Sequence, residues 1–577
     1  MRANDEVAEL LEEYADLIAI TGGDAFKVRV YEKAARSVAG HPEDISTLDA
    51  AGLRGIPNVG KSIALKIEEY LRTGAIHQVE EMRGRIPAGV RRLTRIPTLG
   101  PRRAMLLYEE LGISSVEQLA AAIEEGALHD LHGFGPKTEE NLLHGIELVR
   151  TAGRRSTLGD ALELAESIVA ELSDVPGCER CGYAGSLRRM RDTIGDVDIL
   201  ATSARPADLM AAFSGLPMVE EVIASGPTKT SIRTTKGIQV DLRVVPPDDW
   251  GAALQYFTGS KAHNIRTREI AVRAGLKLSE YGLFEVADGG KSGAKIVSRT
   301  EEEVYARLGL PWIPPQLRED NGEIEAALRG ELPDLVTEDD IRGDLHTHTD
   351  LSDGLASLEE MAAAAADRGY AYYAVTDHAP NLYMHRTSDE KMLAQRSRLR
   401  ELDGTYRGLR LLHGTELNID PEGGVDWPGD FLAGFDLCVA SVHSHFTQPR
   451  DAMTRRLIRA CENPHVHILG HPTARLIGRR PPIDADLDAV FQACARTGTA
   501  VEIDASPDRL DLAAEHIRLA RRHGIVFTID SDAHATPHLD FLRYGVGTAQ
   551  RGWLSADDVL NTWPLERVRR FLSGPPD

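Results

Sequence analysis

Three aspartates in two strand-like segments are suited to holding metal ions for phosphoryl transfer. Asp196 and Asp198 alternate with apolar residues in the segment 195–200, a pattern typical of a half-buried strand. Side chains two positions apart share one face of a strand, so both carboxylates point the same way. Asp241 lies among apolar residues in a second such segment, 238–244. Because buried like charges are unfavourable without a cation, these acids favour a two-metal site.

The hard carboxylate oxygens favour Mg²⁺ or Mn²⁺ as the metal, since Mg²⁺ also takes oxygens from a substrate phosphate. An Asp-x-Asp pair on an exposed edge strand is the alternative, and the third acid counts against it. The turn Gly185-Ser-Leu-Arg-Arg-Met190 lies just before these strands. Its amides, its hydroxyl and the cations of Arg188 and Arg189 are suitable partners for a polyphosphate.

A second group of metal-competent residues follows residue 340, where fourteen of the twenty histidines lie. Strand-like runs separated by helical segments each end in such a residue. This β-α rhythm over about 235 residues predicts a parallel barrel, whose functional groups gather at the C-terminal ends of the strands. Imidazole combined with carboxylate favours Zn²⁺ or Mn²⁺. The runs end in Asp344-Leu-His-Thr-His348, Asp377-His378, Gly414-Thr-Glu416, Val442-His443, Gly470-His471 and Asp532-Ala-His534.

A turn phrase recurs near the N-terminus and predicts contacts with DNA phosphates. Its copies are Gly55-Ile-Pro-Asn-Val-Gly60, Arg95-Ile-Pro-Thr-Leu-Gly100 and His132-Gly-Phe-Gly-Pro136, each before a helix-forming run. Such turns aim free backbone N–H groups at an anion. We therefore expect DNA contacts at Gly55, Gly60, Gly100, Gly133 and Gly135. Asn58 tolerates the left-handed backbone that this turn needs, whereas β-branched Thr98 does not.

Basic and acidic residues are concentrated in different segments of the chain. The net charge of −23 argues against a simple nucleic-acid binder, but residues 83–103 hold seven arginines and no acid. Residues 316–340 hold nine acids and two bases, and we expect an acidic linker there. We expect no signal peptide, because residues 1–13 are acidic and broken by charge, and no apolar stretch reaches membrane-spanning length. The five cysteines, including the Cys178–Cys181 pair of thiols, suggest no disulfide framework. We expect a cytoplasmic protein.

Residues 1 to about 315 resemble the family X DNA polymerases, the family of DNA polymerase beta. The Gly-Ser-x-Arg-Arg turn, the Asp-Val-Asp strand and Tyr256-Phe-Thr-Gly-Ser260 carry the resemblance. It implies triphosphate binding by Arg155, Ser186, Arg189 and Gly195. It further implies a wall beside the sugar from Tyr256 and Phe257, next to Gly259, and sensing of the base pair by Asn264 and Arg268. Gln239 departs from the arginine of the animal members, which puts the contact to the primer end in doubt.

The resemblance extends to the N-terminus. Phe26 to Ala35 is similar to the family's small domain, which holds the 5′-phosphate side of a gap, and implies DNA contacts for Lys27 and Tyr31. Lys66 falls where the family places its Schiff-base lysine and would be catalytic in a lyase reaction. A solvated helix lysine is the alternative for Lys66.

The C-terminal half resembles the PHP (polymerase and histidinol phosphatase) family, a distorted barrel that holds up to three metals. The resemblance places His346, His348, Glu416 and Asp532 on one ion. Glu416 would bridge to a second ion with His443 and His471, and Asp353, His378 and His534 would take a third. Asp344, Asp377 and His445 are candidates for orienting these ligands.

We therefore expect a multidomain α/β and α+β chain. The domains are a helical small domain with a helix-hairpin-helix motif (1–82), a fingers-like domain with two such motifs (83–153), a nucleotidyltransferase palm (154–247), a nucleotide-selecting thumb (248–315), the acidic linker (316–340) and a distorted (β/α)7 TIM-like PHP barrel (341–577).

The expected function is template-directed filling of short gaps in base excision repair, with gapped or primer-template DNA and deoxynucleoside triphosphates as partners and a monomeric chain. The barrel would supply a 3′-5′ exonuclease and, through the same ions, an abasic-site endonuclease or 3′-phosphodiesterase. A repair scaffold with inactive catalytic centres is one alternative. A barrel that acts as a small-molecule phosphatase is the other.

Overall fold

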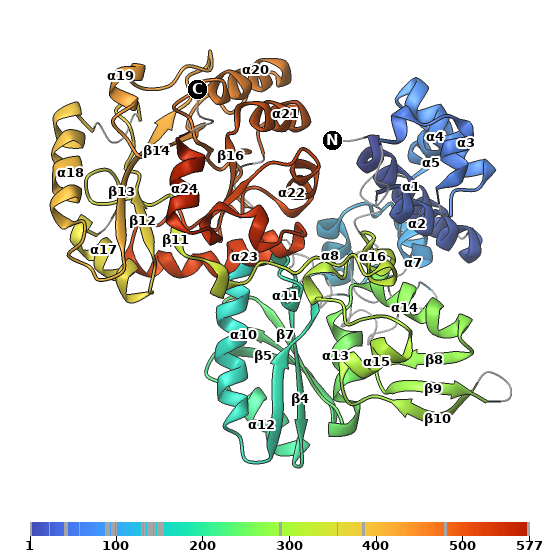
Figure 1. Cartoon of the computed structure of the whole chain (residues 1–577). Helices are drawn as coiled ribbons and strands as arrows, with labels where there is room; N and C mark the ends of the chain where they lie inside the picture. Colours follow the sequence, from blue (N-terminus) through green and yellow to red (C-terminus); the bar gives the residue numbers. More distant parts are fainter. Residues whose placement is uncertain are drawn as a thin grey trace. The chain divides into compact units, whose positions relative to one another are not determined.

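The computed structural model resolves two compact units, residues 1–155 and 156–577, which are described separately (Figure 1). Among the described residues, no helix combines the length and apolar character that a membrane span requires. The structure describes the whole chain except residues 1–2, 22, 40–43, 57, 87–89, 91–92, 94–98, 100, 129–130, 132–133, 135–141, 143–145, 147–154, 288–290, 355, 383–386, 478–479, 481 and 574–577.

The first unit is helical throughout its described part, as the sequence predicted. Its helices turn their apolar stripes inward onto one shared core that includes Leu11, Leu17, Ala34 and Ile67. Asp49 caps one helix by accepting the amides of Ala51 and Gly52. The helices are α1 (Ala3–Ile20), α2 (Ala25–Ala39), η1 (Ile45–Thr47), α3 (Ala50–Gly55), α4 (Lys61–Thr73), α5 (His77–Arg85), α7 (Pro101–Leu111) and α8 (Val116–Glu124).

The second unit begins with a five-stranded sheet in the order β2-β4-β7-β6-β5. Strands β4 and β7 are parallel and the other pairs are antiparallel. The apolar faces of α10 and α12 pack against this sheet. The elements are β1 (Ser156–Thr157), α10 (Leu158–Ser173), β2 (Cys178–Tyr183), α11 (Gly185–Arg188), β3 (Thr193–Ile194), β4 (Asp196–Ser203), α12 (Pro206–Ser214), β5 (Val219–Ser225), β6 (Lys229–Thr234) and β7 (Gln239–Val244).

A smaller subdomain follows, with helices around the antiparallel sheet β10-β9-β8. Ser260 caps α14 by accepting the amide of His263. The elements are η2 (Pro247–Asp249), α13 (Trp250–Thr258), α14 (Lys261–Arg273), β8 (Leu276–Ser279), β9 (Gly282–Val286), β10 (Ser292–Val297), α15 (Glu301–Arg307) and η4 (Pro315–Leu317).

The segment 316–340 corrects a prediction from the sequence. It contains the helix α16 (Glu323–Arg329), and Leu317, Ile324 and Ala327 belong to the core of the smaller subdomain. Arg318 and Glu323 are fully buried. Residues 317–329 are therefore packed structure, because Arg318, Glu319 and Glu323 have partners inside the fold. Glu331, Asp334, Glu338 and Asp339 are exposed, so an acidic linker over that part of the segment stays a prediction.

The remainder is a nearly closed barrel of seven parallel strands in sequential order, as predicted for a PHP fold. A bridge between Thr347 and Ala533 joins its first and last strands, and the helices α17 to α22 lie outside the strands (Figure 1). The elements are η5 (Glu338–Asp340), β11 (Gly343–Asp344), α17 (Leu358–Asp367), β12 (Tyr372–Val375), α18 (Asp389–Leu402), β13 (Arg410–Asn418), α19 (Gly429–Leu432), β14 (Leu437–Ser441), α20 (Arg450–Cys461), β15 (Ile468–Leu469), α21 (Leu487–Thr497), β16 (Ala500–Asp504), α22 (Ala514–Arg521), β17 (Phe527–Asp530), η6 (Thr536–Phe541), α23 (Leu542–Arg551), η7 (Ala556–Asp558), η8 (Leu560–Thr562) and α24 (Leu565–Leu572).

Candidate active sites

The three predicted carboxylates lie on the adjacent parallel strands β4 and β7. Asp198 pairs directly with Asp241 in the register, and Asp196 pairs with Gln239. Neighbouring strands are about 4.8 Å apart, so the opposed carboxylates of Asp198 and Asp241 face each other at short range. Asp241 is buried, Asp198 half-buried and Asp196 exposed. One side of the site is therefore open to a ligand from solvent.

The electrostatics of this group favour a bound cation. Burial, together with the negative charges of Asp196 and Asp241, raises the pKa of Asp198 to about 7. Lys229 partly offsets this charge, since its Nζ lies 2.5 Å from the Asp241 Oδ2. Gln239 donates to the Asp241 Oδ1 at 3.0 Å. The sequence analysis missed Lys229, which lies on β6 and has no motif around it.

The turn before α11 brings backbone close to the carboxylates. The amide of Ala184 donates to the backbone oxygen of Asp198 at 2.8 Å. Gly185 has a φ of 63°, and a Cβ there would overlap the Asp198 Oδ2. Only glycine fits this position. Ser186 follows on α11 and is half-buried, and Gly195 is exposed directly before β4.

Both arginines of the turn already have partners within the protein. Arg188 forms a bidentate pair with Glu301, its Nη2 lying 2.7 Å from the Oε2, and it donates to the Thr258 Oγ1 at 2.7 Å. Arg189 donates from Nε to the Glu319 Oε1 at 3.0 Å and from Nη1 to the Thr258 backbone oxygen at 2.5 Å. Arg188 therefore holds α11 against α13 and α15. Only a rearrangement of Arg189 would free it for a phosphate.

The predicted sugar wall lies at the end of α13. Tyr256 and Phe257 make an edge-to-face contact with ring centroids 5.1 Å apart, and the Arg243 guanidinium lies 4.6 Å from the Phe257 ring. Gly259 has a φ of 68°, and a Cβ there would crowd the Nη1 of Arg189 at 3.2 Å. The residues that follow the sugar wall, Thr258 and Gly259, are thus in direct contact with Arg189 of the turn.

Asn264 supports this wall from α14. Its Nδ2 donates to the Tyr256 backbone oxygen at 2.6 Å, and its Oδ1 accepts from Gln255 at 2.9 Å. Arg268 donates to the Asn264 backbone oxygen at 3.0 Å. Sensing of a base pair by Asn264 and Arg268 stays a prediction.

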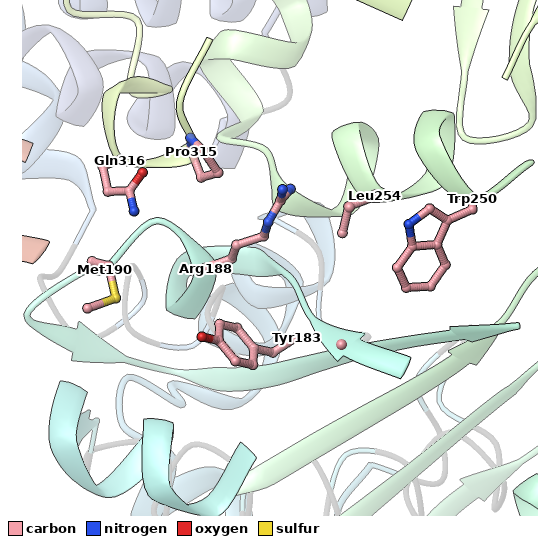
Figure 2. A pocket seen from close by; sticks show the side chains of 8 residues that line it. Tyr183, Arg188, Met190, Trp250, Leu254, Pro315 and Gln316 are labelled. Carbon is pink, nitrogen blue, oxygen red and sulfur yellow. The ribbon is translucent and has the colours of Figure 1, made fainter. Parts of the chain in front are cut away.

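A cavity of about 340 Å³ adjoins α11. Figure 2 shows Arg188 on its wall, with the rings of Tyr183 and Trp250 and the segment Pro315–Gln316 around it. Met190, which ends the turn, also lines it. The turn is therefore loosely packed on the side that faces this cavity.

The nine predicted ligands of the barrel converge at the C-terminal ends of its strands. Glu416 lies at their centre, with its Oε2 2.8 Å from the His378 Nδ1 and its Oε1 3.0 Å from each Nε2 of His443 and His471. Three sets of atoms are close enough to hold one metal ion each. They are His348, Asp353, His378 and His534; His346, His348 and Glu416; and His378, Glu416 and His443.

These sets agree in part with the expected grouping. Glu416 bridges two sets, and Asp353, His378 and His534 stay together as predicted. His348 joins two sets, and Asp532 lies 3.1 Å from the His348 Nε2 and 3.7 Å from the His346 Nε2. The division of the ligands among individual ions stays a prediction.

The donor atoms of the cluster fit metal ions. Among the described residues, several buried ring nitrogens make no hydrogen bond of acceptable geometry although carboxylates lie near them, including the His346 Nε2, both ring nitrogens of His348 and the His378 Nδ1. Buried polar atoms without a partner cost free energy unless they bind a ligand. Burial and the nearby His378 and His534 lower the pKa of His348 to about 4, which keeps its imidazole neutral and able to coordinate.

Two residues that orient the ligands were not found from the sequence. Glu502 on β16 accepts from the His346 Nδ1 at 2.6 Å and from the His471 amide at 2.5 Å. The Asn418 Oδ1 lies 2.7 Å from the His443 Nδ1. The alternation of Val501-Glu-Ile-Asp504 is the same signal that identified the Asp-Val-Asp strand, so Glu502 was detectable.

The three residues that the sequence suggested for orienting ligands do not contact a ligand ring in the described residues, although Asp344 accepts from the His346 amide at 3.3 Å. Asp344 accepts from the Ser531 Oγ at 2.5 Å, and Asp377 accepts from the Thr349 amide and hydroxyl at 2.8 and 2.6 Å. These two carboxylates tie strand ends together. His445 is exposed, with its Nδ1 3.0 Å from the Ser444 Oγ.

In the first unit, one of the three turns lies within the described residues except for Pro57. Gly60 precedes α4, and Asn58 has a φ of 64°, which confirms the left-handed backbone expected there. Gly55 ends α3 and is exposed. Gly100, Gly133, Gly135 and Thr98 lie outside the described residues.

Other predicted DNA contacts in this unit have mixed surroundings. Lys27 is exposed, whereas Tyr31 is buried against Tyr14. The Lys66 Nζ lies 5.6 and 5.8 Å from the ring centroids of Tyr14 and Tyr31. Arg83 pairs with Glu13 at 2.6 Å, so the arginine-rich segment is partly neutralised. Arg155 is the exposed last residue of the unit, and its role at the nucleotide site stays a prediction.

Family models match four parts of the chain. They are a helix-hairpin-helix domain over residues 2–76, a SAM-like helix-hairpin-helix tandem over 90–147, a DNA polymerase beta thumb over 253–319 and a PHP domain over 344–506. The chain is also 36% identical over 570 residues to the DNA polymerase/3′-5′ exonuclease PolX of Bacillus subtilis, covering 98% of this chain and 99% of that protein. The chain belongs to the PolX family.

Two further similarities each cover part of this PolX family chain. A probable phosphatase of Thermoanaerobacter sp. (strain X514) is 29% identical over 244 residues, 40% of this chain and 93% of that protein. DNA polymerase lambda of Rattus norvegicus is 25% identical over 343 residues, 55% of this chain and 56% of that protein. The PolX family chain thus joins a polymerase half to a barrel that also occurs alone.

Proposed function

We propose that the chain fills short gaps in DNA during base excision repair and trims 3′ ends with its barrel. One observation carries the proposal: a single chain holds two separate groups of candidate metal ligands. One is the Asp198–Asp241 pair on β4 and β7, and the other is the histidine cluster around Glu416. The similarity to the PolX protein of Bacillus subtilis, named as polymerase and 3′-5′ exonuclease, supports both halves.

In the polymerase half, each residue has a separable task. The carboxylates of Asp196, Asp198 and Asp241 would hold two divalent ions, Mg²⁺ or Mn²⁺, which when bound activate the primer hydroxyl and stabilise the triphosphate. Arg189 and Ser186 bind the triphosphate. Tyr256 and Phe257 exclude a ribose 2′-hydroxyl by their bulk.

In the barrel, the ligands would hold two or three Zn²⁺ or Mn²⁺ ions, which supply Lewis acidity toward a phosphodiester. Glu502 fixes the orientation of His346 through a 2.6 Å contact, and Asn418 does the same for His443. Asp353 holds the imidazoles of His378 and His534, each Nε2 3.3 Å away. The cluster would position the phosphate of the terminal nucleotide, and it shares no residue with the polymerase carboxylates.

We further propose that the chain acts as a monomer in the cytoplasm. Each of the two sites draws its ligands from this chain alone, so a second copy is not needed to complete either one. Sedimentation of the chain with and without gapped DNA tests this, and a stable dimer at working concentration would contradict it.

Primer extension and 3′ degradation by the full chain test the main proposal. We expect extension of a primer across a short gap when nucleotides are present, and shortening of a single-stranded 3′ tail when they are absent. Both reactions should stop after chelation and return on adding Mn²⁺. A chain that binds gapped DNA but performs neither reaction would be a scaffold.

A second candidate for the barrel is hydrolysis of small phosphate monoesters. The similarity to a probable phosphatase over nearly that protein's whole length favours it. Release of phosphate from p-nitrophenyl phosphate at a rate exceeding that on DNA 3′ ends would support this activity over the exonuclease.

A lyase reaction at Lys66 is a further possibility, favoured by its position beside the rings of Tyr14 and Tyr31. Borohydride should trap a covalent complex with DNA that carries a 5′-sugar phosphate. Lys66→Ala should abolish the trapping, and an undiminished complex would contradict the role of Lys66.

A further inference from the structure

The turn that carries Arg189 is held from behind by the PHP barrel. Arg551, at the end of α23, donates from Nη1 to the Arg189 backbone oxygen at 3.0 Å and to the Glu319 Oε1 at 3.0 Å. Glu319 is the same carboxylate that accepts from the Arg189 Nε. One atom of the barrel therefore contacts both the backbone of Arg189 and the partner of its side chain.

Other contacts fix the same turn against the barrel. A Cβ on Gly547 of α23 would lie 2.5 Å from the Met190 Cε, so helix and side chain are in close contact. The Arg475 Nη1 lies 3.2 Å from the Asp192 Oδ2. Met190 itself has a left-handed φ of 56°. The cavity of Figure 2 lies beside this turn, so the contacts with the barrel add to those that Arg188 and Arg189 make within the polymerase half.

Three arginines surround the carboxylate of Glu319. Burial would raise the pKa of Glu319, but Arg189, Arg551 and Arg191 together lower it, so the carboxylate is ionised. Arg551 is nearly buried, with 9% of its side chain exposed. Without Arg551, the negative charge of Glu319 would fall mainly on Arg189 and hold that guanidinium more firmly.

We propose that Arg551 of the PHP barrel is a positioning residue for the polymerase reaction: it shares Glu319 with Arg189 and anchors the turn, so that Arg189 is available to the incoming triphosphate. The inference rests on the proposed function, in which Arg189 binds the triphosphate. It makes the barrel part of the nucleotide site, beyond its role in trimming 3′ ends.

The test is steady-state nucleotide addition by the full chain on gapped DNA. Arg551→Met should raise the KM for the nucleotide roughly 3- to 10-fold, the effect of about one hydrogen bond of ordinary strength, because the contact acts on Arg189 indirectly. The kcat should change less than about 2-fold, because the contact acts on binding. Arg551→Lys should fall between wild type and Arg551→Met, since lysine keeps the charge but not the two-point geometry.

Arg543→Met is the matched control. Arg543 lies on the same helix and pairs with Glu166 of α10, its Nη1 3.1 Å from the Oε2, but it does not contact the turn. We expect its KM to equal that of wild type. An equal rise in both variants would overturn the proposal in favour of general loosening of the barrel. The 3′-exonuclease rate of each preparation shows that the barrel is folded.

A double-mutant cycle with Glu319→Gln separates positioning from structure. Adding Glu319→Gln to Arg551→Met should restore part of the lost affinity, because the neutral amide releases Arg189. Strictly additive effects would overturn the proposal. Arg189→Met separates the triphosphate role of Arg189 from the positioning role of Arg551. If Arg189→Met raises the KM and Arg551→Met does not, only the role of Arg551 fails. If Arg189→Met leaves KM unchanged, the triphosphate role of Arg189 fails and the inference with it.

Discussion

Gly185 lies so close to the carboxylate of Asp198 that no side chain fits between them, and its φ of 63° excludes most other residues as well. Gly185→Ala should therefore displace Asp198 or the turn and lower nucleotide addition at least about 100-fold, as misplacements near 1 Å do. Exonuclease activity should be unchanged. Gly182→Ala is the control, because a Cβ there meets nothing within 4 Å. Equal polymerase rates in both variants would contradict this close packing.

Glu502 should matter to the exonuclease without binding a metal itself. Glu502→Gln replaces the carboxylate that accepts from both His346 and the His471 amide with a neutral amide that has one acceptor oxygen, and it should lower 3′-exonuclease activity about 10- to 100-fold, as loss of ligand-orienting partners typically does. Metal content by elemental analysis should fall less than in His346→Ala. Glu515→Gln, at an exposed position of α22, serves as the control. An unchanged exonuclease rate in Glu502→Gln would remove Glu502 from the site.

Sugar selection should depend on the aromatic pair at the end of α13. Tyr256→Ala should narrow the preference for deoxyribonucleotides over ribonucleotides by roughly 10- to 100-fold, with synthesis retained. Phe257 lies 5.1 Å from Tyr256, centroid to centroid, and can compensate, so the double variant should show a larger change. Exposed Tyr281 is the control position. An unchanged incorporation ratio in the double variant would show that the pair does not form the wall.

The buried Glu301 should make stability depend on acid pH. Burial alone would raise the pKa of Glu301, but Arg318 and Arg188 lower it to about 2. A carboxyl with a lowered folded-state pKa stabilises the protein above its unfolded value near 4.5, and this contribution is lost as the pH falls toward 2. Glu301→Gln should lower the free energy of unfolding at pH 7 by roughly 2–4 kcal/mol.

The comparison to make is urea unfolding of wild type and Glu301→Gln at several pH values. The difference between them should shrink between pH 4.5 and pH 3. Glu302→Gln, at the exposed neighbouring position, should match wild type throughout. A difference that stays constant with pH would mean that the ion pairs of Glu301 do not stabilise the fold.

Local pattern was sufficient to predict which strands bring the carboxylates and imidazoles together. The alternation in Asp196-Val-Asp198 specifies one face of a strand, and repeated strand ends carry the barrel ligands to one rim, whatever their sequence separation. These features follow from periodicity, which a sequence displays directly. The register that sets Asp198 opposite Asp241 could not be predicted in this way, because adjacency of two strands does not fix their register.

Long-range ion pairs could not be predicted in the same way. Nothing near Arg188 or Arg189 indicates that their partners are Glu301 and Glu319, more than a hundred positions away. For the same reason the segment 316–340 resembled a solvated linker, although Glu319 and Glu323 are partners of buried groups. The density of charged residues along the sequence shows where acids lie, but it does not show which basic residues pair with them in the fold.

The independence of the two centres is tested most directly by one assay on one substrate, a gapped duplex with a single-stranded 3′ tail on a second end. Asp196→Ala with Asp198→Ala should abolish primer extension and leave tail degradation at the wild-type rate, because the barrel ligands are intact. His346→Ala with His348→Ala should do the reverse and bind less metal. Loss of both activities in either variant, or extension surviving in the aspartate variant, would contradict two separate active sites in this chain.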